Sequence, residues 1–138
     1  MKRIMAIDYG TVKTGIAVTD PLKIAAHGLN TVPTSKLMDF FEEYFFTENV
    51  ETIVFGEVIR ADGTKGSNHE KMQKLMQKIQ KKYPEIKITT FDESYTSQRA
   101  KEIILKSGVK KKKRRDKTLV DKISAILILQ DYMEANSI

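Results

Sequence analysis

The stretch RIMAIDYGTVKTGIAVTD, residues 3–20, decides which fold the sequence predicts. Its apolar run from Ile4 to Ile7 is typical of a strand that is buried on both faces. A Gly-flanked turn follows, and IAVTD returns as a second strand, so the two segments are expected to form a β-hairpin. Asp8 stands at the end of the first strand. Because burying a bare carboxylate is very costly, Asp8 must lie in an open cleft, meet a cation or lose its charge.

The length and composition of the chain predict one globular domain. With 138 residues and 41% hydrophobic content, the chain can form one core but not two, so residues 1–138 are expected to be a single domain. No apolar run has the length of a membrane span, and the N-terminal MKRIMAIDYG is too short and too soon acidic for a signal peptide. We therefore expect a cytoplasmic protein with no membrane partner.

The rarity of cysteine and histidine restricts the kinds of metal site that the protein can form. The sequence contains no cysteine, which excludes disulfides and thiolate metal sites and favours a reducing compartment. His27 and His69 are too few for a His-based zinc site, and we expect both to be surface or packing residues. Any bound metal would have oxygen ligands, which favours Mg²⁺, with Mn²⁺ as a substitute.

The positive charge of the chain is concentrated in one segment. The run KKKKRRDK, residues 110–117, holds seven of the 24 basic residues and one of the 18 acidic ones, which leaves 17 of each elsewhere. A chain that is neutral outside one basic segment is typical of a local contact with a polyanion. The expected nucleic-acid-binding residues of this segment are Lys110, Lys111, Lys112, Lys113, Arg114, Arg115 and Lys117. The alternative is that the segment is a solvated tether.

Turn signals and hydrophobic periodicity predict the remaining elements. We expect a third antiparallel strand (23–32), a helix capped by Ser35 (36–49), a strand (50–59), a helix (69–83), a strand (86–91), a helix ending at Gly108, and a well-buried last helix (118–134). Right-handed crossovers make the fourth and fifth strands parallel to the first. The predicted fold is a mixed α/β, five-stranded sheet, three antiparallel strands then two parallel, flanked by helices.

Carboxylates follow three of the predicted strands. Asp8 ends the first strand, Glu57 follows TIVFG, and Asp92-Glu93 follows KITTF. Since ligand clefts in such sheets lie beyond the carboxyl ends of the parallel strands, these acids are expected to share one rim. Divalent cations between them, beside a basic segment, would make a coherent site for a phosphodiester.

Each acid also has a simpler interpretation. Asp8 could start a turn by accepting backbone hydrogen bonds, and Glu93 could be a solvated turn residue. Asp121 fits a capping box, [ST]-x-x-[DE], with Thr118 as the cap. Glu57 could be a strand-end residue that faces solvent.

Four motifs together resemble the YqgF family. They are AIDYGTVKTGIAVTDPL, DGTKGSN, FDESYTSQRA and LVDKISAILILQDYM, in the order and spacing of that family and over nearly the whole chain. The resemblance implies a cytoplasmic bacterial protein with an RNase H-like fold, acting in Holliday junction resolution or in 5′ maturation of pre-16S rRNA. It places the metal-binding, catalytic acids on Asp8, Glu93 and Asp121. Gly10, Thr11 and Lys13 match the family's glycine–threonine–basic turn.

Two positions depart from the family pattern. Ser94 stands where the family has an arginine after Asp-Glu, and Gly56-Glu57-Val58 replaces a Gly-Leu-Pro-like sequence. These departures bear on catalysis and substrate rather than on fold. Glu57 could act as a fourth ligand, or as an alternative to Glu93.

The sequence thus predicts a Mg²⁺-dependent nuclease. Lys13 and the 110–117 segment would hold phosphates, so that the shape of the nucleic acid, either pre-rRNA or branched DNA, sets specificity. A resolvase that cuts two strands symmetrically would act as a homodimer. One alternative is a nucleic-acid-binding factor with weak or lost catalysis, which Ser94 favours. Another is an ATP-binding domain of the sugar kinase, actin and Hsp70 group, although those proteins need two such domains.

Overall fold

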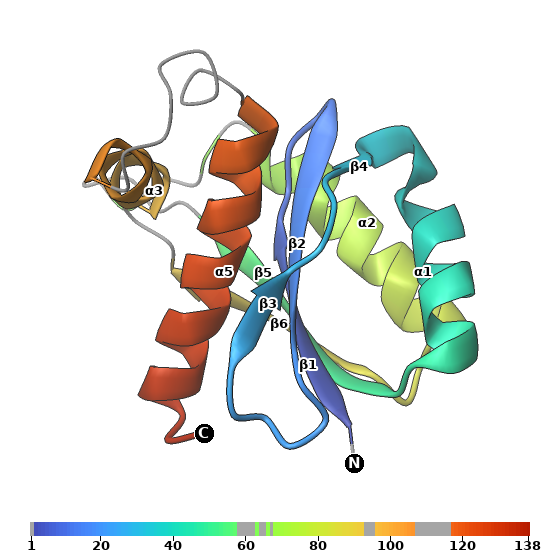
Figure 1. The fold of residues 1–138 in the computed structure, drawn as a ribbon. Coiled ribbons are helices and arrows are strands. Elements are labelled where there is room, and N and C mark those ends of the chain that lie inside the picture. The colour runs from blue at the N-terminus through green and yellow to red at the C-terminus, as the bar shows by residue number, and fades with distance from the viewer. Residues whose placement is uncertain (1, 58–62, 64–65, 67, 93–95, 107–116) are drawn as a thin grey trace.

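The computed structural model describes residues 2–57, 63, 66, 68–92, 96–106 and 117–138 (Figure 1). The elements, in chain order, are β1 (Arg3–Asp8), β2 (Lys13–Thr19), β3 (Ala26–Gly28), β4 (Val32–Pro33), the 3-10 turn η1 (Thr34–Lys36), α1 (Leu37–Thr47), β5 (Val50–Glu57), α2 (His69–Lys82), β6 (Lys87–Asp92), α3 (Thr96–Lys106) and α5 (Lys117–Ala135).

The strands form one mixed sheet, which confirms the predicted fold class. Within the described residues, the sheet has six strands in the order β3-β2-β1-β5-β6, and β4 pairs with β2. The β1–β2 and β2–β3 pairs are antiparallel. The β1–β5 and β5–β6 pairs are parallel. The carboxyl ends of β1, β5 and β6 therefore lie at one edge, called here the carboxyl edge.

The predicted third strand is two short strands instead of one. Ala17 pairs with Gly28, and Thr14 pairs with Val32. Gly28 and Val32 are four residues apart, whereas their partners on β2 are only three residues apart. One extra residue of this kind produces a bulge that interrupts the ladder. The Leu29 amide still donates to the Ile16 carbonyl at 2.8 Å, which keeps the chain against β2 between the two strands.

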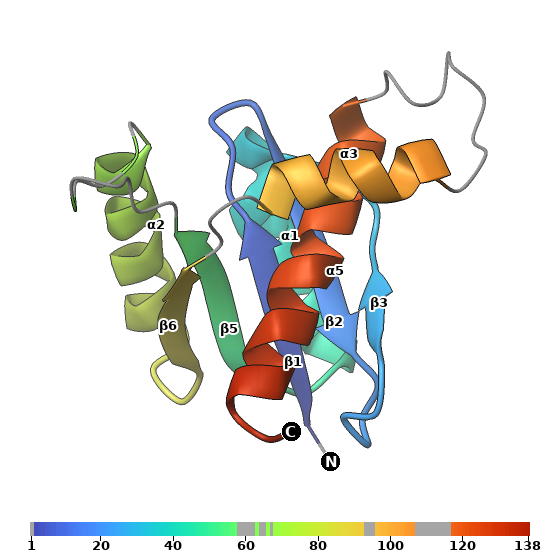
Figure 2. The same ribbon diagram turned by 90° about the vertical axis from the view of Figure 1, so that its left-hand side faces the viewer.

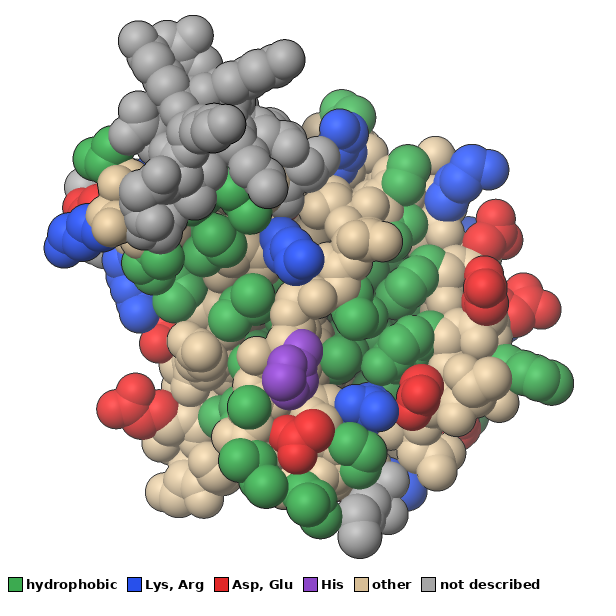
Figure 3. Space-filling view, viewed as in Figure 1, with side chains coloured by type: hydrophobic (Ala, Val, Ile, Leu, Met, Phe, Trp, Pro, Cys, Tyr) green, Lys and Arg blue, Asp and Glu red, His purple; other side chains and the backbone are tan. Residues whose placement is uncertain are grey.

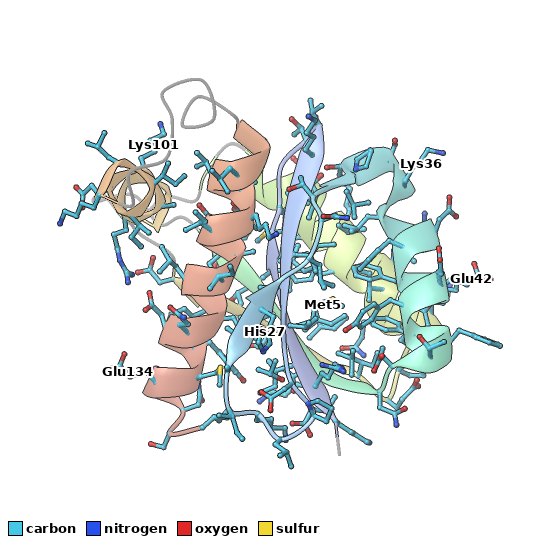
Figure 4. All side chains as sticks on the ribbon, in the orientation of Figure 1. Met5, His27, Lys36, Glu42, Lys101 and Glu134 are labelled. Carbon is cyan, nitrogen blue, oxygen red and sulfur yellow. The ribbon has the colours of Figure 1, made fainter. Side chains whose placement is uncertain are left out.

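Helices cover both faces of the sheet (Figures 1 and 2). α5 packs on one face, where Ile4, Ala6 and Val54 meet its buried residues, and α3 packs on α5. α1 and α2 cover the other face, where Met5 points toward them (Figure 4). As expected, the middle of α5 is buried, with Ala125, Ile128 and Leu129 fully enclosed. None of the described helices is long and apolar enough to cross a membrane.

One predicted helix start was wrong, and a second differs from the structure by one residue. Ser35 lies inside η1, and α1 begins at Leu37 with no side-chain cap. The neighbouring Thr34 hydroxyl instead contacts Gly10, so this segment is fixed by the hairpin and not by a cap. α5 begins at Lys117, one residue before the expected cap Thr118. Because residues 107–116 lie outside the described part of the chain, the capping-box interpretation of Asp121 stays a prediction.

Candidate active site at the carboxyl edge of the sheet

Asp8 and Asp121 meet at Gly15. Asp8 is the ladder partner of Gly15, and strand alternation turns both toward α5, as it does Ala6. Gly15 has no side chain, and the backbone of Asp121 fills the space: its carbonyl oxygen would clash with any Cβ added to Gly15. The Cβ of Asp121 itself lies 3.3 Å from that point. Two acidic residues from distant parts of the sequence thus lie beside the same glycine.

The surroundings of these two acids suit charged groups. Both residues are partly exposed, so neither carboxylate is sealed in the core, and both make further interactions within the structure. They lie above the apolar contact between α5 and the sheet. Asp8 is therefore partly open to solvent, which agrees with one of the three alternatives that the sequence left for it.

Glu57 and Asp92 lie on the opposite face of the sheet to Asp8, as the alternation of side chains along a strand shows. They are ladder partners at the ends of β5 and β6. Phe55 and Ile53, two and four residues before Glu57, belong to the core under α1 and α2. Glu57 and Asp92 therefore face the α2 side of the sheet, opposite to Asp8. All three lie at the carboxyl edge, as expected, but on two different faces.

The neighbour of Glu57 is His69, at the start of α2. Its Nδ1 lies 3.1 Å from Glu57 Oε1, although this buried nitrogen has no partner with hydrogen-bond geometry among the described groups. Glu57 is 9% exposed, so it does not face solvent as its simpler interpretation required. Sequence reasoning left His69 as a surface or packing residue, since nothing in a linear pattern links it to a strand end twelve residues earlier. His27 lies exposed on the edge strand β3 and is labelled in Figure 4. The space-filling view in the same orientation shows a histidine at the surface of this face (Figure 3).

The remaining predicted residues divide into two groups. Glu93, Ser94 and the basic residues 110–116 lie outside the described residues, and Lys117 is described only as the first residue of α5. Lys13 begins β2 and is exposed. Asp20, near the end of the motif AIDYGTVKTGIAVTDPL, lies at the opposite end of β2, where its Oδ1 accepts hydrogen bonds from the amides of Ile24 and Ala25, both at 2.8 Å. Hydrogen bonding, chiefly from Ala25, lowers the pKa of Asp20. Asp20 therefore orders a loop at the opposite end of β2 to the acids of the carboxyl edge.

Sequence reasoning missed the role of Gly15. The signal was available, because a glycine inside an otherwise apolar strand often marks the close approach of another backbone. The sequence does not show which backbone approaches, since Asp121 lies more than a hundred positions later.

The donors present fit a hard divalent cation. Asp8 and Asp121 supply carboxylate oxygens, which Mg²⁺ prefers over nitrogen and sulfur. Within the described ranges, no three acidic or histidine side chains cluster closely enough to hold a metal ion. A third ligand would have to come from elsewhere in the chain.

A family model decides where the chain belongs. The model described as RuvX, Holliday junction resolvase, matches residues 2–135. The chain belongs to this family. The expected YqgF resemblance is thereby confirmed, and membership in RuvX supports a nuclease role.

Similar curated proteins span the whole RuvX chain. A protein of Christiangramia forsetii, named "Putative pre-16S rRNA nuclease", is 47% identical over 96% of this chain and 98% of its own. One of Porphyromonas gingivalis with the same name is 46% identical over 97% of each chain.

Solved structures support the fold of this RuvX chain. T. thermophilus RuvC in complex with a Holliday junction substrate matches with a TM-score of 0.57 and 14% identity, over 99% of this chain and 98% of RuvC. The fowlpox virus Holliday junction resolvase matches with a TM-score of 0.55 and 14% identity, over 96% and 99% of the two chains. At this identity the likeness concerns the fold, which is the expected RNase H-like one.

Proposed function

We propose that residues 1–138 form a single nuclease domain that uses a divalent cation, Mg²⁺ or Mn²⁺, held by Asp8, Asp121 and Glu93. The observation that carries the proposal is the meeting of Asp8 and Asp121 at Gly15. Glu93 lies outside the described residues and is included because the family pattern places the third acid there.

The reaction is phosphodiester hydrolysis. A water oxygen bonds to phosphorus as the bond to the 3′-oxygen breaks, which leaves a 5′-phosphate and a 3′-hydroxyl. A bound cation would acidify the attacking water and offset the charge that develops on the phosphate. Asp8 and Asp121 supply the negative charge that holds it. Lys13, exposed at the start of β2, and the basic segment 110–117 hold flanking phosphates, which positions the strand without reading its sequence.

Structured RNA is the substrate that we favour. The relatives at 46–47% identity are named "Putative pre-16S rRNA nuclease", and a role in rRNA processing supports a cytoplasmic location. Branched DNA is the second candidate, because the family model is described by Holliday junction resolution. A homodimer belongs to that second candidate, since symmetric cutting of two strands needs two copies of the site.

The test is cleavage of a precursor rRNA fragment and of a four-way DNA junction, with Mg²⁺, with Mn²⁺ and with neither. We expect Asp8→Asn and Asp121→Asn each to abolish cleavage and leave binding nearly unchanged, because each keeps its size and loses a metal-holding charge. Asp39→Asn is the matched control, since Asp39 is an exposed acid in the first turn of α1.

Two results would contradict the proposal. If Asp8→Asn cleaves within about tenfold of wild type, the metal-ligand assignment fails, because loss of a metal ligand costs far more. If wild type binds both substrates tightly but cuts neither at any metal concentration, the chain is a nucleic-acid-binding factor without catalysis.

A further inference from the structure

The turn between β1 and β2 presents an apolar side chain to solvent. Val12 is 73% exposed, between the exposed residues Thr11 and Lys13. Single exposed apolar residues are common on protein surfaces, and Ile24, also 73% exposed, is one of them at the far end of β2. The position of Val12, and not its exposure alone, is therefore what needs an explanation.

The turn is held rigidly against the body of the protein. The Val12 carbonyl accepts a hydrogen bond from the Thr34 amide at 2.9 Å. The Thr34 hydroxyl donates to the Gly10 carbonyl at 2.6 Å and lies 2.9 Å from the Thr14 hydroxyl. β4 pairs with Lys13 and Thr14 along the same turn. A Cβ on Gly10 would clash with the Lys13 carbonyl, so the turn is also closed on itself.

This rigid turn adjoins the candidate active site. Asp8 ends the strand that enters the turn, and its partner Gly15 lies on the strand that leaves it. In Figures 1 and 4 the turn stands at the end of the sheet where α5 begins and where Lys36 of η1 lies. Val12 therefore lies four residues after Asp8, in a turn at the edge of the sheet where the candidate active site lies.

We propose that Val12 packs against the exposed face of the last base pair of a duplex, so that the enzyme selects a boundary between double-stranded and single-stranded nucleic acid. This inference rests on the proposed nuclease function and names the shape that the site selects. Lys13, next in sequence, holds the adjoining phosphate while Val12 covers the base pair.

A duplex end is the surface that suits this residue. Pushing an apolar side chain between stacked base pairs costs a few kcal/mol per step, whereas the last pair of a duplex already exposes an apolar face. Valine has one side-chain torsion and strong rotamer preferences, and the turn is fixed before binding. Little conformational entropy is therefore lost when Val12 meets the base pair.

The test measures binding to three RNAs in an Asp8→Asn background: a stem with a single-stranded extension, a continuous duplex, and a single strand. We expect Val12→Ser to weaken binding to the extended stem about tenfold, which corresponds to about 1.4 kcal/mol, and to leave the other two within about twofold. Val12→Leu, which keeps an apolar side chain, should bind the extended stem like wild type. The salt dependence stays the same, because no charge is removed. Ile24→Ser, equal in exposure and distant from the site, is the control.

A fluorescent base analogue in the last pair of the stem gives a second readout. Wild type should change its emission on binding, and Val12→Ser should not. A stem of the same design in DNA shows whether the selected boundary is specific to RNA; an equal loss on the DNA stem supports the shape-based inference.

Two outcomes overturn the inference. One is a Val12→Ser variant that binds all three RNAs like Ile24→Ser. The other is an equal loss on all three, which would make Val12 a general contact. If wild type binds no nucleic acid at all, the proposed function itself fails, which is a distinguishable result.

Discussion

Gly15 controls how closely α5 approaches the sheet. A methyl group there would meet the carbonyl oxygen of Asp121, and a backbone atom in a packed interior has little freedom to move away. We predict that Gly15→Ala lowers the free energy of unfolding by about 1–3 kcal/mol, the usual cost of overpacking. It should also reduce cleavage about a hundredfold, since Asp121 would be displaced from Asp8. Urea unfolding and the cleavage assay measure the two effects.

Gly28→Ala is the matched control for this prediction. Gly28 faces α5 two strands from Asp8, and a methyl group there would lie 2.7 Å from Cε and 2.8 Å from Cγ of Lys122. A lysine side chain can rotate aside, so we expect a smaller loss of stability and nearly normal cleavage. Equal effects of the two variants would mean that Gly15 has no special relation to the active site.

Glu57 lies at the same edge of the sheet as the proposed catalytic acid Asp8 but faces the other side. Its contact is with His69, so we predict that Glu57→Gln keeps Mn²⁺ affinity and cleavage within about threefold of wild type. Glu93→Gln should lower both strongly, and the double variant should match Glu93→Gln. Residues that share a cation couple energetically, so clear non-additivity between the two substitutions would make Glu57 a fourth ligand.

At the scale of elements, the β4–η1 segment supports the turn between β1 and β2. The Thr34 hydroxyl contacts both the Gly10 carbonyl and the fully buried Thr14 hydroxyl. Thr34→Val keeps the shape and removes both contacts, so we predict a loss of about 1–3 kcal/mol, the cost of leaving buried polar groups unpaired. Amide hydrogen exchange should accelerate at the turn.

Thr47→Val provides the comparison. The Thr47 hydroxyl is exposed and lies 3.5 Å from the Tyr44 carbonyl, so its loss should change neither stability nor exchange at the turn. If Thr34→Val also leaves exchange unchanged at Val12 and Lys13, the turn does not depend on this support. The hydrogen bonds of Thr34 would then not explain the fixed position that we assign to Val12.

The sequence predicted elements well where a single periodic pattern decides the structure. The apolar run of β1, the crossover helices and the buried middle of α5 follow from hydrophobic periodicity. The division of the third strand into β3 and β4 does not, because it depends on one extra residue opposite β2. The side on which an end residue lies is decided by register, so the separation of Asp8 from Glu57 required the observed pairing. The contact of Asp121 with Gly15 joins residues too distant in sequence for any local pattern to reveal.

At the scale of the whole molecule, charge is unevenly placed, and this predicts how binding depends on salt. Each phosphate contact that is lost flattens the log–log dependence of affinity on salt by roughly 0.7–0.9. We predict that neutralising Lys110 to Lys113 with glutamine weakens binding to all nucleic acids about equally and flattens this slope. Filter binding over a series of salt concentrations measures both quantities.

A matched control separates local contact from total charge. α2 carries five exposed lysines, and replacing four of them, Lys71, Lys74, Lys78 and Lys81, by glutamine removes the same charge from the opposite side of the sheet to α5. Beyond about 10 Å at 0.1 M salt, exposed charges are largely screened, so the α2 variant should keep the wild-type slope. Equal slopes in the two variants would show that net charge governs binding. An unchanged slope in the 110–113 variant would show that the basic segment is a solvated tether and that phosphates are held elsewhere.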